Sequence, residues 1–139
     1  MVNAYIGLGS NLDNPIEHIH QAVEDLKTLP KSQLILASKL YLSKPVGPQD
    51  QDDFINSVVM LETTLEPLAL LDHLQAIEQS HQRVRKRHWG PRTLDLDLLL
   101  FGDLSIQNAR LTVPHTEINN RDFVIGPLYE LCPELALPN

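Results

Sequence analysis

Residues 2–30, VNAYIGLGSNLDNPIEHIHQAVEDLKTLP, predict a strand that is followed directly by a helix. The strand at positions 2–8 contains the β-favouring residues Val2, Tyr5 and Ile6, and the glycines of GLGSN end the run. Asp13 or Asn14 then precedes Pro15, and a proline is well tolerated in the first turn of a helix. The apolar residues after it recur at steps of three and four, so we expect one buried face on a helix that ends near residue 30: Ile16, Ile19, Val23 and Leu26.

The pattern of a strand followed by a helix then recurs further along the chain. In chain order we expect strands at 34–42 and 54–64, a helix from 66 to 81, a strand at 93–101, an extended piece at 110–113 and a last helix from near 120 to 131. Leaving out the last two elements, the order is βαββαβ. That order predicts an α+β ferredoxin-like sandwich, in which helices pack on one face of an antiparallel sheet, here with a C-terminal helix added.

Length and composition predict one soluble domain that spans residues 1–139. The chain has 139 residues, of which 42% are hydrophobic and 21% charged, and this composition excludes general disorder. Its one cysteine, Cys132, cannot form an internal disulfide. We see neither a secretion signal nor an apolar run of roughly 20 residues, so we expect a cytoplasmic protein without a membrane segment.

The arginines are confined to one part of the chain. Residues 1–82 carry eleven acidic and four basic side chains, whereas residues 83–121 carry seven basic and four acidic ones. All six arginines lie in this second segment: Arg83, Arg85, Arg87, Arg92, Arg110 and Arg121. The planar guanidinium fork suits phosphate oxygens, although charged loops also occur simply to stay solvated. The net charge of −7 argues against a nucleic-acid partner.

The strand at 93–101 carries two acidic side chains on one face. Asp95 and Asp97 are two residues apart, so both project to the same side, and Leu94, Leu96 and Leu98 project to the other side as core anchors. Two close carboxylates repel each other unless a cation lies between them, and Mg²⁺ accepts such ligands together with phosphate oxygens. A solvated strand face is the alternative.

Metal ligands beside an arginine-rich segment point to phosphoryl transfer, in which positioning and charge neutralisation dominate. The chain contains no P-loop motif, because GLGSN lacks both the spacing and the lysine. We interpret Gly7 and Gly9 as giving the backbone freedom at the end of a strand. Three further residues leave a binding and a structural interpretation open, namely Trp89, Asn56 and His115.

Several motifs resemble one known family. RVRKRHWGPRTLDLDLLLFG, at residues 83–102, is similar to the signature of the 6-hydroxymethyl-7,8-dihydropterin pyrophosphokinases of folate biosynthesis. AYIGLGSNL, VGPQDQDDFINSVV, RLTVPH and NRDF extend the resemblance over nearly the whole chain. The resemblance implies a Mg²⁺-dependent enzyme that moves the terminal pyrophosphate of ATP to the pterin hydroxymethyl group and releases AMP. ATP and hydroxymethyl-dihydropterin would then be its partners, and we expect a monomer.

The same resemblance assigns roles to individual residues. Asp95 and Asp97 would ligate two magnesium ions, and Arg83, Arg85 and Arg92 would be catalytic. The nucleotide side would comprise Gln75, Glu78, Arg85, Trp89, Arg92, Arg110, Thr112, His115 and Arg121. The pterin pocket would comprise Ser43, Val46, Phe54, Asn56, Trp89 and Phe123, with the ring stacked between two aromatic side chains. Trp89 would move inward as the basic segment closes and excludes water.

Two other function classes are consistent with the fold. An RNA-binding module would need aromatic rings along its strands, whereas only 5% of residues are aromatic and the fourth strand carries aspartates. A non-catalytic regulatory domain that binds a small ligand would leave the paired aspartates without a clear use.

Overall fold

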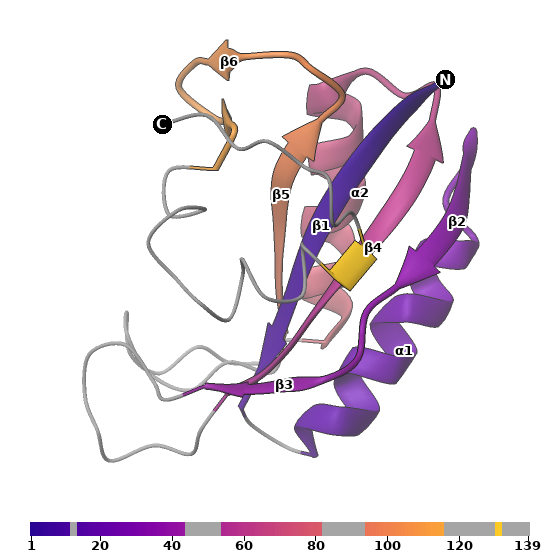
Figure 1. Ribbon diagram of the computed structural model, residues 1–139, viewed down its shortest axis with the longest axis vertical. Helices are drawn as coiled ribbons and strands as arrows, with labels where there is room; N and C mark the ends of the chain where they lie inside the picture. Colours follow the sequence, from indigo (N-terminus) through magenta and orange to yellow (C-terminus); the bar gives the residue numbers. More distant parts are fainter. Residues whose placement is uncertain (12–13, 44–53, 82–93, 116–129, 132–139) are drawn as a thin grey trace.

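An antiparallel sheet organises the chain, with the strands in the order β2-β4-β1-β5 and with β3 also paired to β4 (Figure 1). This computed structural model describes residues 1–11, 14–43, 54–81, 94–115 and 130–131. The strands of the sheet are β1 (Val2–Ser10), β2 (Ser32–Ala37), β3 (Tyr41–Ser43), β4 (Phe54–Thr63) and β5 (Asp95–Phe101). A small second sheet pairs β6 (Ile106–Gln107) with β7 (Thr112–Val113).

Two helices cover one face of this sheet, α1 (Pro15–Lys27) and α2 (Pro67–His81), and both lie behind it in Figure 1. Leu26 of α1 and Leu70 and Leu74 of α2 are fully buried against the sheet. Both helices begin at a proline, as the sequence predicts. Ile16 was expected on the buried face of α1, but it is 48% exposed, because Ile19, Ala22 and Leu26 already fill the contact with the sheet. The described residues include no helix long and apolar enough to cross a membrane.

The predicted α+β class is confirmed. The strand order and the side covered by the helices are those of a ferredoxin-like sandwich. The predicted strand at 34–42 is wrong in one respect, since it is two strands, β2 and β3. At the break the Ser38 hydroxyl, instead of a backbone carbonyl, accepts the N–H of Val58 at 2.9 Å. A register shift between Leu34 and Leu36 also bends β2 just before this break.

A second bulge lies in β5. Tyr5 of β1 pairs with Leu100 and Ile6 pairs with Leu98, so Leu99 is the extra residue. Leu99 and Leu100 consequently pack in the same apolar cluster, on the sheet face opposite the helices. We call this helix-free side the open face. The remainder of the cluster is Tyr5 and Val58, with Met60 and Leu131 packed against it.

The last described residues, 130 and 131, contact the open face. Residues 130–131 are helical and lie in front of the sheet in Figure 1, while the rest of the helix predicted from near 120 to 131 lies outside the described residues. The hydroxyl of Tyr41 donates to the Glu130 carboxylate at 2.6 Å, and the backbone N–H of Lys39 donates to its other oxygen at 2.9 Å. This contact links β3 to a segment that is about 90 residues distant in sequence.

Replacing Tyr41 by phenylalanine is expected to lower the thermal midpoint slightly at neutral pH, and less in acid. The Tyr41 hydrogen bond, helped by the Lys39 N–H, lowers the pKa of Glu130 below its ordinary value of 4.5. The stability that a lowered carboxyl pKa contributes is fully present above pH 4.5. It is lost as the pH falls through the pKa that the carboxyl has in the folded protein. The same bond raises the pKa of Tyr41 above 10.0, so its contribution is also lost at very alkaline pH. Thermal unfolding of both proteins near pH 7 and near pH 3 measures the effect, and an equal difference at both would contradict it.

Candidate active site

The two acidic side chains of β5 project to the open face. Asp95 is half-buried and Asp97 is exposed, whereas the leucines that alternate with them are buried in the core beneath the helices: Leu94, Leu96 and Leu98. The prediction that these leucines anchor the strand is therefore confirmed. Because the strand is fixed from the helix side, both carboxylates are carried on a rigid element.

Glycines lie beside both carboxylates. Gly9 of β1 pairs with Asp95 on one side and with Asn56 of β4 on the other. Gly7 pairs in the same way with Asp97 and with Val58. Neighbouring strands are about 4.8 Å apart, so the backbones of Asn56 and Asp95 lie roughly 10 Å apart, and the residue between them has no side chain of its own. We call the two glycine positions of β1 on the open face, Gly7 and Gly9, the glycine trough.

The predicted role of Gly7 and Gly9 is wrong. Among the described glycines only Gly102 has a positive φ, so neither residue provides unusual backbone freedom. A side chain would be tight at Gly9, whereas at Gly7 it would make an ordinary van der Waals contact. A Cβ on Gly9 would lie 3.2 Å from the amide oxygen of Asn56, and one on Gly7 would lie 3.4 Å from Leu99. The signal in the sequence was that G-x-G and D-x-D share the same two-residue spacing on strands that pair.

The predicted pterin residues that the structure describes gather along β3 and β4. Asn56 is 6% exposed and pairs with Tyr41, and Phe54 pairs with Ser43. A Cβ on Gly9 would also lie 3.8 Å from the ring of Phe54, so Phe54 and Asn56 border the trough opposite Asp95. An aromatic face and a buried amide at one wall suit a flat polar ring.

The described nucleotide-side candidates form a second group beyond the outer edge of β5. The guanidinium of Arg110 donates to Gln75 at 3.1 Å and to Asp72 at 2.6 Å. Thr112 lies in β7, and the backbone N–H of His115 donates to the carbonyl of Leu99 at 3.0 Å. Both helix α2 and the segment after β5 therefore contribute to this edge.

Glu78 occupies a different kind of position, since its carboxylate accepts the backbone N–H of Leu96 at 2.8 Å. The remaining predicted site residues lie outside the described residues: Val46, Arg83, Arg85, Trp89, Arg92, Arg121 and Phe123.

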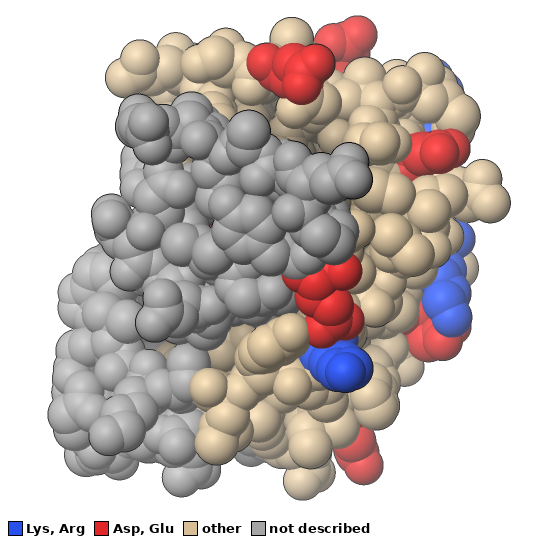
Figure 2. All heavy atoms as spheres, viewed as in Figure 1, with Lys and Arg blue, Asp and Glu red and all other residues tan. Residues whose placement is uncertain are grey.

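The donor set on the open face fits a hard cation. Among the described residues no group of three or more His, Cys, Asp and Glu side chains gathers to hold a metal. The two aspartates alone therefore offer the one or two carboxylates that Mg²⁺ usually takes from a protein, with other positions left to water or phosphate. On the face shown in Figure 2, acidic and basic side chains of the described residues are interspersed rather than collected in one basic patch.

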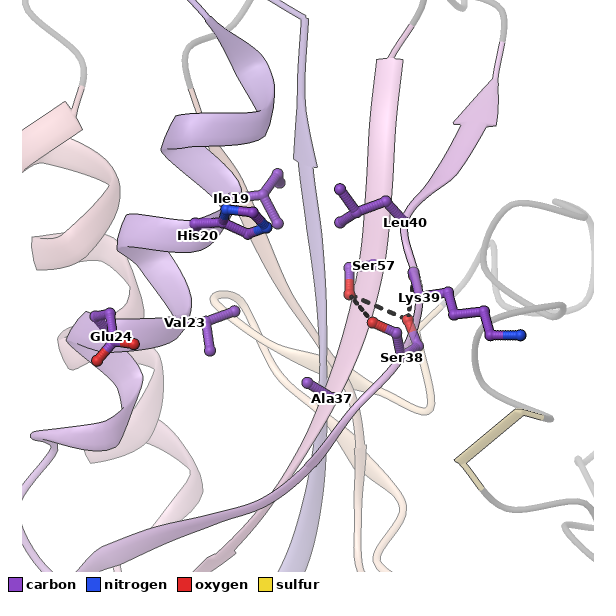
Figure 3. A pocket seen from close by; sticks show the side chains of 9 residues that line it. All are labelled: Ile19, His20, Val23, Glu24, Ala37, Ser38, Lys39, Leu40 and Ser57. Carbon is purple, nitrogen blue, oxygen red and sulfur yellow. Dashed lines mark hydrogen bonds between the residues drawn. The ribbon is translucent and has the colours of Figure 1, made fainter.

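A cavity of about 270 Å³ lies away from this site, between α1 and the break that separates β2 from β3 (Figure 3). Ile19, Val23 and Leu40 point into it. The Ser38 and Ser57 hydroxyls beside it hydrogen-bond to each other at 3.0 Å. Because Ser57 belongs to the helix-covered side of β4, this cavity is separated from the aspartates by the sheet.

Comparison with known proteins identifies the family. The family model for 7,8-dihydro-6-hydroxymethylpterin-pyrophosphokinase matches residues 5–133. The chain belongs to this family. It is 54% identical over 139 residues to the 2-amino-4-hydroxy-6-hydroxymethyldihydropteridine pyrophosphokinase of Haemophilus influenzae, covering 100% of this chain and 87% of the relative. It is 51% identical over 135 residues to the enzyme of that name in Pseudomonas aeruginosa, covering 97% of this chain and 83% of the relative.

The fold is similar to that of a larger protein of known structure. A crystal structure of Plasmodium falciparum HPPK-DHPS aligns with a TM-score of 0.73 at 15% identity, covering 98% of this chain and 41% of that chain. The predicted function is confirmed by the family and the relatives: this pyrophosphokinase transfers pyrophosphate from ATP to 6-hydroxymethyl-7,8-dihydropterin in folate biosynthesis. The alternatives of an RNA-binding module and a regulatory domain are therefore set aside.

Proposed function

We propose that pyrophosphate transfer by this chain depends on two Mg²⁺ ions held by Asp95 and Asp97. The observation that carries this proposal is that both carboxylates project from β5 to the open face, where each pairs with a glycine of β1. Their oxygen atoms match the preference of Mg²⁺. Bound Mg²⁺ would supply charge neutralisation for the attacking and leaving oxygens of a phosphoryl transfer.

We propose that the pterin ring binds beside the glycine trough, against the side chains of β3 and β4. Phe54 and Phe123 would stack on the ring, and Asn56 would hydrogen-bond its polar edge. Burial of the Asn56 amide supports this role, because a buried amide discriminates strongly against a ring that lacks matching hydrogen bonds. Ser43, Val46 and Trp89 complete the proposed pocket.

The triphosphate is proposed to lie on the side of Asp95 and Asp97 that faces α2 and β7. Arg83, Arg85, Arg92, Arg121 and His115 would contact phosphate oxygens, for which guanidinium groups are well suited. Gln75, Arg110, Thr112 and Trp89 are the further nucleotide-side residues of the proposal. We also propose that residues 1–139 form one domain that acts as a monomer in the cytoplasm.

The products of the reaction test the metal dependence. With ATP, Mg²⁺ and the pterin alcohol together, mass spectrometry is expected to detect AMP and the pterin diphosphate. Adding excess EDTA is expected to stop the reaction, and added Mg²⁺ is expected to restore it. Omitting the pterin alcohol serves as the control, because AMP is expected only when the acceptor is present. Full turnover in EDTA would contradict the Mg²⁺ proposal, and ADP as the product would contradict pyrophosphate transfer.

A further inference from the structure

Glu78 makes a contact that a nucleotide ligand would not explain. It lies in the last turn of α2, and one of its carboxylate oxygens accepts the backbone N–H of Leu96 at 2.8 Å. β5 is at the edge of the sheet, and among the strands that the structure describes it pairs only with β1. The N–H of Leu96 is thus on the outer edge, where water would otherwise satisfy it.

A carboxylate is an electrostatically costly choice at this place. A negative charge near the C-terminal end of a helix opposes the helix dipole. Asp95 and Asp97 flank Leu96 and bring two more carboxylates close to it. Hydrogen bonds to an ionised acceptor are about twice as strong as those between neutral groups. The stronger bond to the Leu96 N–H offsets this cost and fixes that peptide group more firmly.

That peptide group bears on both aspartates, since it adjoins Asp95 and is followed by the peptide that leads to Asp97. The N–H of Leu96 belongs to the peptide that joins Asp95 to Leu96, so holding it restricts the backbone at Asp95 directly and the backbone at Asp97 through the next peptide of the strand. Further along the same strand, the His115 N–H donates to the carbonyl of Leu99 at 3.0 Å. One edge of β5 is therefore held by its pairing with β1. The other edge is held by two hydrogen bonds, one at Leu96, before Asp97, and one at Leu99, after it.

We propose that Glu78 is a positioning residue, whose carboxylate holds the Leu96 peptide so that the Asp95 and Asp97 side chains stay at the separation that binds a divalent cation. It acts through the strand and not by contact with the nucleotide. This proposal rests on the metal-binding role that we propose for Asp95 and Asp97. It replaces the nucleotide-side role implied for Glu78 by the resemblance.

Two variants of Glu78 and one of its neighbour test this proposal. Glu78→Ala removes the acceptor, whereas Glu78→Gln keeps an acceptor oxygen without the charge. Gln79→Ala is the matched control, because Gln79 is the adjacent, exposed residue on α2. The readouts are amide hydrogen exchange at Leu96 by NMR, the Kd for Mn²⁺ as a spectroscopic substitute for Mg²⁺, and kcat and KM for ATP.

Loss of a hydrogen bond to a charged group is expected to speed exchange at Leu96 about tenfold or more in Glu78→Ala. Mn²⁺ binding is expected to weaken by about 10- to 100-fold, the usual cost of removing a group that orients a metal ligand. We expect kcat to fall while KM for ATP changes little. Glu78→Gln is expected to recover most of the exchange protection and of the Mn²⁺ affinity, and Gln79→Ala to match the wild type.

Normal exchange at Leu96 and normal Mn²⁺ affinity in Glu78→Ala would overturn the positioning role, and a raised KM for ATP alone would return Glu78 to the nucleotide side. If Glu78→Ala does not fold, Glu78→Gln carries the test, since protection lost at Leu96 without loss of Mn²⁺ affinity would also overturn the proposal. Asp97→Asn tests the metal site separately. Unchanged Mn²⁺ binding in that variant would overturn the proposed function itself, whatever the Glu78 variants show.

Discussion

Turnover is expected to fall about 1000-fold or more when Asp97 is replaced by alanine, with the thermal midpoint nearly unchanged. A bound metal ion stabilises the charge of a phosphoryl-transfer transition state by several kcal/mol, and each 1.4 kcal/mol or so corresponds to a factor of ten in rate. The fold should survive because Asp97 is exposed, while the neighbouring Leu96 and Leu98 remain buried in the core. Steady-state kinetics with ATP and the pterin alcohol, together with thermal unfolding, measure both effects.

Asp103→Ala is the matched control for Asp97→Ala. Asp103 is an exposed acidic residue just after the end of β5, so it reports the effect of losing one negative charge near the strand. We expect its kcat to stay close to that of the wild type. If Asp97→Ala kept most of its rate, the metal role of Asp97 would have to be abandoned.

Replacing Gly9 by valine is expected to weaken pterin binding about 100-fold or more, an effect of roughly 3 kcal/mol from filling the trough. Even the single Cβ of an alanine would lie 3.2 Å from the Asn56 amide oxygen, and valine adds two methyl groups to the same space. Strand formation itself should not suffer, since valine favours strands. Calorimetric titration of the pterin alcohol into Gly9→Ala and Gly9→Val measures the graded loss.

Gly7→Ala separates this effect from a general cost of losing a strand glycine. A Cβ at Gly7 would meet the Leu99 side chain at 3.4 Å and lies in the next row of the sheet, beside Asp97 and not beside Asn56. We expect a much smaller change in pterin affinity for this variant. Pterin affinity that is unaltered in Gly9→Val would show that the ring does not lie over Gly9.

Local patterns were sufficient for most of the fold. The start of each helix follows from a proline, and the buried faces follow from apolar residues three and four apart. The alternation of leucine and aspartate also placed Asp95 and Asp97 correctly on the face away from the core. Each of these signals involves residues within a few positions of one another.

The features that the sequence did not reveal depend on partners far away in the chain. The extra residue Leu99 is visible only when β5 is aligned with β1, because the run from Leu98 to Leu100 is apolar throughout. Gly9 acquires its role from Asn56 and Asp95, which belong to two other strands. The bond from Leu96 to Glu78 joins a strand to a helix that precedes it by 18 residues, and no periodicity marks such a contact.

The extra residue in β5 also sets a direction for anything that binds. Leu99 stands against Gly7, and behind it the open face is filled by Tyr5, Val58 and Leu100. A ligand over Gly9 therefore meets an apolar barrier on that side. Toward the opposite margin, where β1 ends at Ser10 and where β4 and β5 begin, the open face carries the polar side chains of Asn56 and Asp95. The insertion of one leucine thus divides the described open face into an apolar half and a polar half, and we expect the polar groups of a bound molecule to lie over the polar half.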